Sequence, residues 1–375
     1  MDEVFMNLFV TGGCGFIGAN FIRYILQREP ACRVFNLDKL TYAGNPANLA
    51  GIEKAFPGRY RFVRGDICDT RLVSALFAEQ AFDAVINFAA ESHVDRSISD
   101  PAPFITTNVL GAQALLSAAH AAGIPRFVHI STDEVYGSLG PDDAAFTEST
   151  PLAPNSPYSA SKAGADLLVR AFHKTYGMNT IITRCSNNYG PYQFPEKLIP
   201  LMLRRAGRNE SLPVYGDGGN IRDWIHVEDH CLGVYLALTR GRSGAIYNFG
   251  GHAERTNLEV VRALLEILGK SEELIRFVQD RPGHDRRYAM DYSLAAQELD
   301  YAPQWNFSSG LAATAEWYAQ NAAWLDGVES GAYRSFMRTW YADRLGDEHL
   351  AQSENFVYEE RSKLSQSPAS MRKSV

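Results

Sequence analysis

Short hydrophobic runs alternate with longer amphipathic segments along the first 185 residues of the chain. The runs are rich in Val, Ile and Phe, and they predict strands over residues 8–11, 33–37, 60–63, 84–88, 127–130 and 180–184. Between the runs, apolar residues recur at helical spacing, which predicts helices over 16–28, 70–80, 102–122 and 158–176. Alternation of this kind predicts βαβ units with right-handed crossovers, and hence a doubly wound parallel sheet.

The pattern changes after residue 186, where Pro, Gly and Asn become frequent and the helical segments become shorter. We interpret residues 1–186 as one domain and 187–345 as a smaller, mixed α/β domain that binds substrate. The segment 228–252 is expected to return to the first domain, through a strand over 246–249. Residues 346–375 are polar and Ser-rich, which predicts an additional helix or a disordered tail.

Composition narrows the classes of protein and its compartment. The chain has 375 residues, 46% of them hydrophobic and 21% charged, which is typical of a soluble globular protein. A net charge of −7 without a basic stretch argues against nucleic acid as a partner. The acidic N-terminus and the lack of long apolar runs argue against a signal peptide and a membrane span. Five cysteines are scattered along the chain, at positions 14, 32, 68, 185 and 231. Their scatter predicts a cytoplasmic protein without disulfides or structural zinc.

A glycine-rich loop follows the first predicted strand and opens the first predicted helix. It reads G-x-x-G-x-x-G from Gly12 and also G-x-G-x-x-G from Gly13. Glycines there let backbone N–H groups approach a pyrophosphate at a helix N-terminus, although a glycine-rich turn alone is weak evidence. Asp38, at the end of the second strand and 20 residues past Gly18, can accept hydrogen bonds from the ribose of NAD and repel the phosphate of NADP. These features predict a Rossmann-type NAD-binding domain, in which Lys39 leaves some tolerance for NADP.

Tyr158 and Lys162 lie four residues apart at the start of a predicted helix, with Pro157 in its first turn and Asn155 or Ser156 as its cap. The two side chains share one helix face. A phenol must lose about 3 pKa units, or about 4 kcal/mol, to act as a base at neutral pH. A lysine ammonium at about 4 Å supplies roughly that energy, and the oxidised nicotinamide adds further positive charge, so we expect a lowered pKa for Tyr158. Such a pair can take a proton from a hydroxyl group while a hydride leaves the same carbon for NAD.

Two adjacent carboxylates, Asp133 and Glu134, follow the apolar run 127–130. At the end of a strand buried on both faces, carboxylates cost desolvation energy unless they meet a partner or act in a reaction. One interpretation is that the strand has ended and both acids are solvated loop residues. The other is a pair for acid–base chemistry, in which burial and the neighbouring charge keep Asp133 protonated.

Several motifs together resemble the extended short-chain dehydrogenase/reductase family, and within it the nucleotide-sugar dehydratases that act on dTDP-glucose. The resemblance covers about residues 6–345. Its motifs are TGGCGFIG (11–18), LDKLTYAGN (37–45), AAESHVDRSI (89–98), STDEVYG (131–137), YSASK (158–162), RCSNNYGPYQFPEKLIP (184–200), RDWIHVEDH (222–230) and DRPGHDRRYAMD (280–291).

The resemblance implies a reaction and a role for five residues. Thr132 and Tyr158 hold the 4-hydroxyl of the sugar, and Tyr158 with Lys162 oxidises C4 with NAD. Glu134 takes the C5 proton, Asp133 protonates the departing C6 hydroxyl, and the hydride returns to C6. The implied reaction is conversion of dTDP-glucose to dTDP-4-keto-6-deoxyglucose, catalysed by a lyase.

The same resemblance implies a binding site for each ligand. Besides Tyr158 and Lys162, the expected NAD contacts are Gly12, Gly15, Phe16, Ile17, Gly18, Asp38, Lys39, Thr41, Asp66, Ile67, Phe88, Ala89 and Ala90. The expected substrate contacts are Glu91, Ser92, Asn187, Lys197, Pro213, Tyr215, Arg222, Asn257, Arg281 and His284. Arg287 is a further candidate for the diphosphate, and we expect no metal.

Alternatives remain open within and beyond enzymes. A UDP-glucose 4,6-dehydratase would use the same chemistry, because the base is chosen by only a few contacts. A nucleotide-sugar 4-epimerase or a UDP-hexuronate decarboxylase is disfavoured by the adjacent pair Asp133 and Glu134. A non-catalytic NAD sensor is disfavoured because Tyr158 and Lys162 are also present. The Ala- and Leu-rich helices 102–122 and 158–176 fit the homodimer that the family forms through a four-helix bundle.

Overall fold

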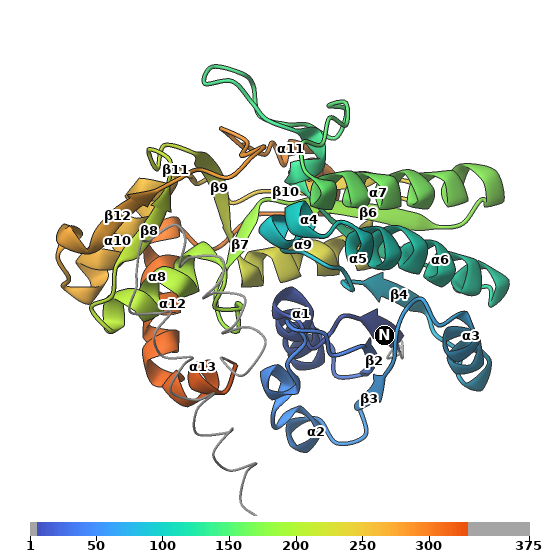
Figure 1. The fold of residues 1–375 in the computed structure, drawn as a ribbon. Helices are drawn as coiled ribbons and strands as arrows, with labels where there is room; N and C mark the ends of the chain where they lie inside the picture. The colour runs from blue at the N-terminus through green and yellow to red at the C-terminus, as the bar shows by residue number, and fades with distance from the viewer. Residues whose placement is uncertain (1–5, 329–375) are drawn as a thin grey trace, which may run out of the picture.

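A seven-stranded sheet, in which every strand pairs with its neighbours in parallel, forms the centre of the molecule (Figure 1). This computed structural model describes residues 6–328. The strand order is β10-β6-β5-β4-β1-β2-β3, which confirms the predicted doubly wound sheet. The strands are β1 (Met6–Thr11), β2 (Cys32–Asp38), β3 (Tyr60–Arg64), β4 (Ala84–Asn87), β5 (Phe127–Thr132), β6 (Thr180–Cys185) and β10 (Ile246–Phe249).

Helices cover both faces of this sheet, because its central strands are apolar on both sides. One face packs against α1 (Phe16–Arg28) and α9 (Val227–Arg240), with Phe21 and Val234 in the shared core. The other face packs against α3 (Thr70–Glu79), α6 (Ala112–Ala121) and α7 (Pro157–Tyr176). The helix α7 begins at a capping box formed by Ser156 and Ser159, which selects one of the two predicted caps.

The predicted helix 102–122 is not a single α-helix. It consists of α5 (Ala102–Phe104), a π-helical segment η2 (Ile105–Gly111) and α6. Within η2, the amide group of Asn108 forms hydrogen bonds with both backbone groups of Glu91 and with Ser161. This segment is therefore fixed to the loop after β4, as is typical of π-bulges near functional sites.

The remaining described chain forms mostly a second layer of short strands and helices beside the sheet (Figure 1). Its strands are β7 (Asn187–Tyr189), β8 (Leu212–Tyr215), β9 (Ile221–His226), β11 (Glu254–Thr256) and β12 (Ile275–Val278). Its main helices are α8 (Leu198–Gly207), α10 (Asn257–Leu268), α12 (Phe307–Gln320) and α13 (Ala322–Val328). Smaller elements are η1 (Pro46–Leu49), α2 (Ile52–Ala55), α4 (Val94–Ser99), η3 (Asp133–Tyr136), η4 (Glu272–Leu274) and α11 (Ser293–Leu299).

These strands and helices agree with a mixed α/β second region that has its own core, built around Trp224, Val260 and Leu311. The predicted boundary at residue 186 stays a prediction, although β10 does pair with β6 at the edge of the large sheet. The prediction for residues 346–375 lies outside the described residues. Within residues 6–328, no helix is both long and apolar enough to cross a membrane.

Candidate active site

The glycine loop after β1 is shaped by close backbone contacts. Gly12 has φ +69°, and a Cβ atom there would lie 2.6 Å from the backbone nitrogen of Ala89. Gly15 follows as the cap of α1, which has no side-chain hydrogen bond at its first turn. The free N–H groups of that turn and the absence of side chains leave a cradle that fits a pyrophosphate.

Asp38, at the end of β2, borders the same cavity and is fixed by the backbone. Its carboxylate accepts hydrogen bonds from the N–H groups of Cys14 at 2.8 Å and Leu40 at 2.7 Å. Burial raises the pKa of Asp38, and these two hydrogen bonds oppose that shift. The neighbouring Lys39 forms an ion pair with Asp66 at 2.7 Å, so much of its charge is already compensated. Both features favour the unphosphorylated ribose of NAD.

One cavity brings together all the residues that were predicted to contact NAD and all five predicted catalytic residues. It lies at the carboxyl ends of the strands, where doubly wound sheets bind their ligands. The predicted substrate residues Glu91, Ser92, Asn187 and Lys197 also line it. Sequence reasoning missed other lining residues, namely Leu37, Ala43, Gly44, Gly65, Thr107, Ile130, Ser131, Cys185, Ser186, Asn188, Gln193, Phe194 and Glu196.

Lys162 and Tyr158 project from the first turns of α7 into this cavity. The Nζ atom of Lys162 donates a hydrogen bond to the carbonyl oxygen of Ile130 at 2.6 Å and lies 3.5 Å from Nε2 of His129. Burial lowers the pKa of Lys162 to about 8, while the charge of Asp166 opposes that shift. Lys162 is therefore mostly cationic at neutral pH and is fixed against β5.

Lys162 by itself does not give Tyr158 a lowered pKa, and the expectation that includes the nicotinamide charge stays a prediction. Burial raises the pKa of Tyr158 well above its ordinary value, and the negative charge of Glu134 raises it further. A side-chain hydrogen bond with Thr132 acts in the opposite direction. A phenolate at this position needs an additional positive charge nearby, and the oxidised nicotinamide ring carries one.

Thr132 ends β5, and the two carboxylates follow it in η3. Asp133 is only 2% exposed, which excludes the interpretation that it is a solvated loop residue. The Thr132 hydroxyl donates to Oδ1 of Asp133 at 3.1 Å, whereas Oδ2 is buried without a hydrogen-bond partner among the described residues. Burial and the charge of Glu134 raise the pKa of Asp133 well above its ordinary value. The carboxyl group therefore favours the protonated form of a general acid.

Glu134 has a different electrostatic environment from its neighbour. Burial raises its pKa, but the positive charges of Arg281, Lys197 and Arg222 all lower it. These cations belong to the second region, so the carboxylate lies where the two regions meet. The pKa of Glu134 is raised overall, but the three cations limit the rise, whereas the pKa of Asp133 is raised well above its ordinary value. The environments of the two carboxyl groups therefore differ in the direction that an acid and a base in an elimination require.

The other predicted substrate residues lie outside the lining of the cavity, and the structure groups them differently. Arg281 and Tyr215 meet at Asp95, and His284 forms an ion pair with Asp280. The remaining residues have mainly structural contacts. Arg222 donates hydrogen bonds to the carbonyl oxygens of residues 221 and 285, and Arg287 forms an ion pair with Glu254. Pro213 lies in β8, which pairs with β12, and Asn257 is the first residue of α10.

Comparison with known proteins agrees with this geometry. The family model described as GDP-mannose 4,6 dehydratase matches residues 9–314. The dTDP-glucose 4,6-dehydratase of Xanthomonas campestris is 53% identical over 343 residues, covering 87% of this chain and 96% of that protein. The Escherichia coli K12 enzyme, dTDP-glucose 4,6-dehydratase 1, is 48% identical over 363 residues, covering 90% and 100%. The crystal structure of DesIV, a dTDP-glucose 4,6-dehydratase from Streptomyces venezuelae with NAD and TYD bound, has a TM-score of 0.83 and 52% identity, covering 86% and 100%.

The chain belongs to the dTDP-glucose 4,6-dehydratase family. The family model is named after a GDP-mannose enzyme, whereas the relatives that are about half identical to this chain are named dTDP-glucose 4,6-dehydratases. The relatives therefore give the more specific family. The adjacent Asp133 and Glu134 agree with this narrower assignment, since they lie in STDEVYG (131–137), one of the motifs that resemble the dehydratases acting on dTDP-glucose.

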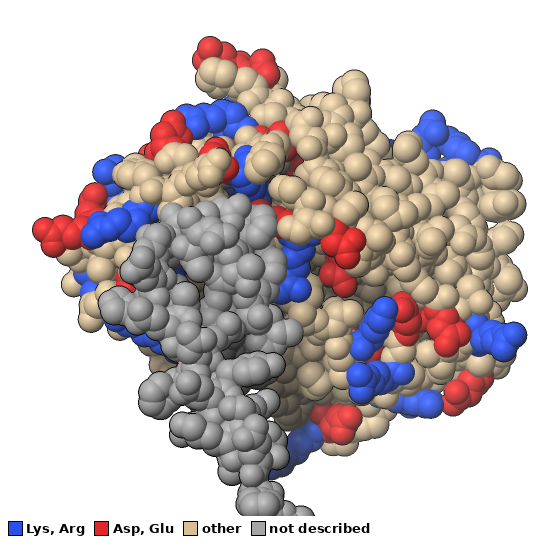
Figure 2. All heavy atoms as spheres, viewed as in Figure 1, with Lys and Arg blue, Asp and Glu red and all other residues tan. Residues whose placement is uncertain are grey.

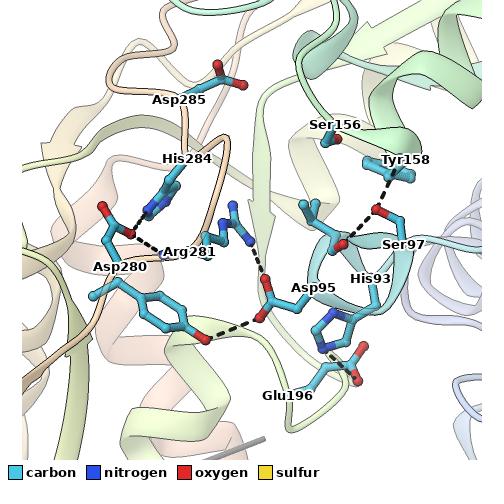
Figure 3. Close-up of polar contacts among 12 residues, drawn as sticks. His93, Asp95, Ser97, Ser156, Tyr158, Glu196, Asp280, Arg281, His284 and Asp285 are labelled. Atoms are coloured by element: carbon cyan, nitrogen blue, oxygen red, sulfur yellow. Dashed lines mark hydrogen bonds and ion pairs between the residues drawn. The ribbon is translucent and has the colours of Figure 1, made fainter. Parts of the chain in front are cut away.

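Among the buried residues that the sequence predictions missed, His93 and Asp95 connect the two regions, and Ser97 contacts Tyr158 within the first region (Figure 3). His93 contacts Glu196 at 3.3 Å, and Asp95 forms a 2.9 Å ion pair with Arg281. Ser97 accepts a hydrogen bond from the backbone nitrogen of Tyr158 at 3.2 Å. His93, Asp95 and Ser97 lie inside the motif 89–98, so their position beside Glu91 and Ser92 was the signal that the predictions did not use.

Glu196 is one of the missed residues that line the cavity, and its electrostatic environment is unusual. Burial raises its pKa to about 7, and the positive charges of Lys197 and Arg96 oppose that shift. Its Oε1 atom accepts a hydrogen bond from the Tyr42 hydroxyl at 3.1 Å. Among residues 6–328, no cluster of three or more His, Cys, Asp or Glu side chains could hold a metal, and the expectation of a metal-free enzyme stays a prediction.

Proposed function

We propose that this protein is a lyase that converts dTDP-glucose to dTDP-4-keto-6-deoxyglucose, with NAD as a recycled cofactor. The observation that carries the proposal is the adjacent pair of buried Asp133 and half-buried Glu134 beside Tyr158 and Lys162, at the carboxyl edge of the sheet. A simple oxidoreductase needs only the tyrosine and lysine. A second acid and base are needed when water is eliminated.

The chain's own residues account for each proton transfer. Tyr158 takes the proton of the C4 hydroxyl, and the Lys162 ammonium holds the phenolate by its charge. Glu134 then removes the C5 proton, which the new C4 ketone has made acidic. Asp133 gives a proton to the C6 hydroxyl, which leaves as water, and Glu134 returns a proton to C5. When bound, NAD accepts the hydride from C4 and returns it to C6.

The cations of the second region support a nucleoside diphosphate as the part of the substrate that anchors the sugar in the site. Lys197, Arg222 and Arg281 all act electrostatically on Glu134, so they lie close to the reacting sugar. Guanidinium and ammonium groups are the side chains that bind diphosphates in proteins. The family relatives favour thymidine over uridine as the base, and UDP-glucose is the alternative substrate with the same chemistry.

One experiment tests the substrate and the recycled cofactor together. We expect purified protein, without added NAD, to convert dTDP-glucose faster than UDP-glucose into a product lighter by one water, measured by mass spectrometry. Reduced nicotinamide should not accumulate at 340 nm, because each hydride returns to C6. A product of unchanged mass would indicate an epimerase, and stoichiometric NAD consumption would contradict the proposal.

We also propose a homodimer that assembles through α7 and the α5–η2–α6 segment. Large apolar side chains are exposed there: Ile105, Leu110 and Leu167. Figure 2 shows few charged side chains over these helices on the face it presents. Such an apolar helical face is typical of an interface between subunits. We further propose a cytoplasmic location, because all five cysteines are free thiols.

A further inference from the structure

The proposed reaction leaves two side chains out of balance after every turnover. Tyr158 gains the proton of the C4 hydroxyl and keeps it, because C4 remains a ketone in the product. Asp133 loses a proton, because the C6 hydroxyl leaves as water. Glu134 takes and returns the same number of protons at C5. The enzyme must therefore move one proton from Tyr158 to Asp133, directly or through solvent, before it can react again.

Thr132 borders the same cavity as both of these residues. Its hydroxyl donates to Oδ1 of Asp133 at 3.1 Å, and its side chain acts on Tyr158 closely enough to lower the pKa of the phenol. All three side chains are at least nine-tenths buried. Within the described part of the chain, Oδ2 of Asp133 has no hydrogen-bond partner, so its carboxyl group is connected to other side chains through Thr132.

We propose that the Thr132 hydroxyl carries a proton from Tyr158 to Asp133 at the end of each turnover and thereby resets both residues. The inference rests on the function proposed above. The O–H bond of Tyr158 breaks as its proton passes to Oγ of Thr132. The original proton of Thr132 passes to Oδ1 of Asp133. No electrons are exchanged, and the three side chains together carry one negative charge before and after.

This route has a physical advantage over an exchange with solvent. A separate loss of a proton from Tyr158 and gain of one by Asp133 would change the charge of a buried site twice, which is costly in a low-dielectric interior. A transfer along the hydrogen bonds keeps the charge constant. Rotation about the Cβ–Cγ bond of Asp133, a broad two-fold torsion, then turns the protonated oxygen toward the sugar. The product of the transfer, a phenolate and a carboxylic acid, is the pair that the next substrate needs.

Two variants of Thr132 test the relay. Thr132→Val keeps the shape of the side chain but removes the hydroxyl, and Thr132→Ser keeps the hydroxyl. Rapid-quench measurements with dTDP-glucose give the rate constant of the first turnover and the steady-state rate. The ratio of the two removes any effect of the substitution on sugar binding, because both rates come from one variant. We expect this ratio to match the parent in Thr132→Ser and to be at least about a hundredfold larger in Thr132→Val, as the loss of a general acid–base group predicts. Equal ratios in the two variants would overturn the proposal.

A second measurement uses only the parent protein and remains informative if Thr132→Val does not fold. An internal relay makes the steady-state rate independent of the concentration of a small buffer acid such as imidazole at fixed pH and ionic strength. A rate that rises with imidazole would show that solvent resets Asp133, and would refute the relay. Failure of the proposed function gives a different result from failure of the relay. If the proposed function is wrong, the parent protein forms no product lighter by one water.

Discussion

The two ends of the cleft are built by different means. At the cofactor end, the backbone sets the geometry: Gly12 packs against Ala89, and Asp38 is held by two N–H groups. At the proposed substrate end, outside the lining of the cavity, pairs of charged side chains set it, such as Arg281 with Asp95 and His284 with Asp280. Backbone contacts come from short segments that follow the strands. The Arg281–Asp95 pair joins residues 186 positions apart.

This difference explains how each end responds to substitution. A backbone-built site fails when a side chain is added, because neighbouring atoms have no room to move. A site built from charged pairs fails when a partner is removed, because the other charge stays partly buried and uncompensated. The reacting carboxylates lie where the two ends meet, and they depend on both.

The largest expected effects lie at that meeting point. In Glu134→Gln, C4 oxidation should still occur, so reduced nicotinamide should appear and stall, with little deuterium entering C5 from heavy water. In Asp133→Asn, C5 exchange should continue while the loss of water slows. Each substitution should lower turnover by about 10²–10⁴-fold, as for other general acids and bases. Tyr158→Phe is the control, because it should show no reduced cofactor at all.

Normal C5 exchange in Glu134→Gln, or normal loss of water in Asp133→Asn, would contradict these roles. The 131–134 stretch would then be a sugar-binding edge rather than the site of elimination.

Adding a methyl group tests the backbone-built end. Gly12→Ala should weaken NAD binding by about tenfold to a hundredfold, because it combines a positive φ with contact against Ala89. The matched control is Gly51→Ala, since Gly51 has φ +78° but open space around its Cβ position. Isothermal titration with NAD should separate the two variants. Equal affinities of the two variants for NAD would contradict the idea that the close approach of Gly12 to Ala89 shapes the NAD site.

Removing a charge tests the substrate end. Asp95→Ala leaves the guanidinium of Arg281 without its ion pair, and should lower the free energy of unfolding by about 2–3 kcal/mol. The control is Glu272→Ala, which breaks an exposed pair with Arg262 of similar length and should cost less than about 1 kcal/mol. Urea unfolding gives both values. Similar losses in the two variants would show that the Asp95 pair behaves as a surface pair.

The smallest expected effect is a pH dependence set by Lys162. With its pKa lowered to about 8, the side chain is cationic below that pH and neutral above it. A neutral Lys162 no longer stabilises the phenolate, so the rate of NAD reduction should be halved near pH 8 and should fall further as the pH rises. Stopped-flow absorbance in Glu134→Gln isolates this step. Lys162→Arg should remove the decline, because arginine stays charged over this range, and a decline that persists would assign it to another group.

Much of the cofactor end was predictable because its determinants are close together in sequence. The glycine loop, Asp38 and the Tyr158–Lys162 pair each sit at the end of a hydrophobic run or the start of a helix, and strand–helix alternation places those ends at one edge of a sheet. The predicted NAD contacts accordingly line one cavity in the structure. Patterning thus determined the fold class, and the motifs determined the cofactor residues and the family.

Tertiary structure alone decided the electrostatics and the long-range partners. Periodicity carries no information on which charges meet, so Asp95 beneath Arg281 and His93 beside Glu196 were missed. The sequence showed Lys162 four residues from Tyr158, but not the burial of the phenol or the charge of Glu134, both of which raise the pKa of Tyr158. A pKa depends on the solvent and charges that surround a group in space, and only the folded chain sets those surroundings.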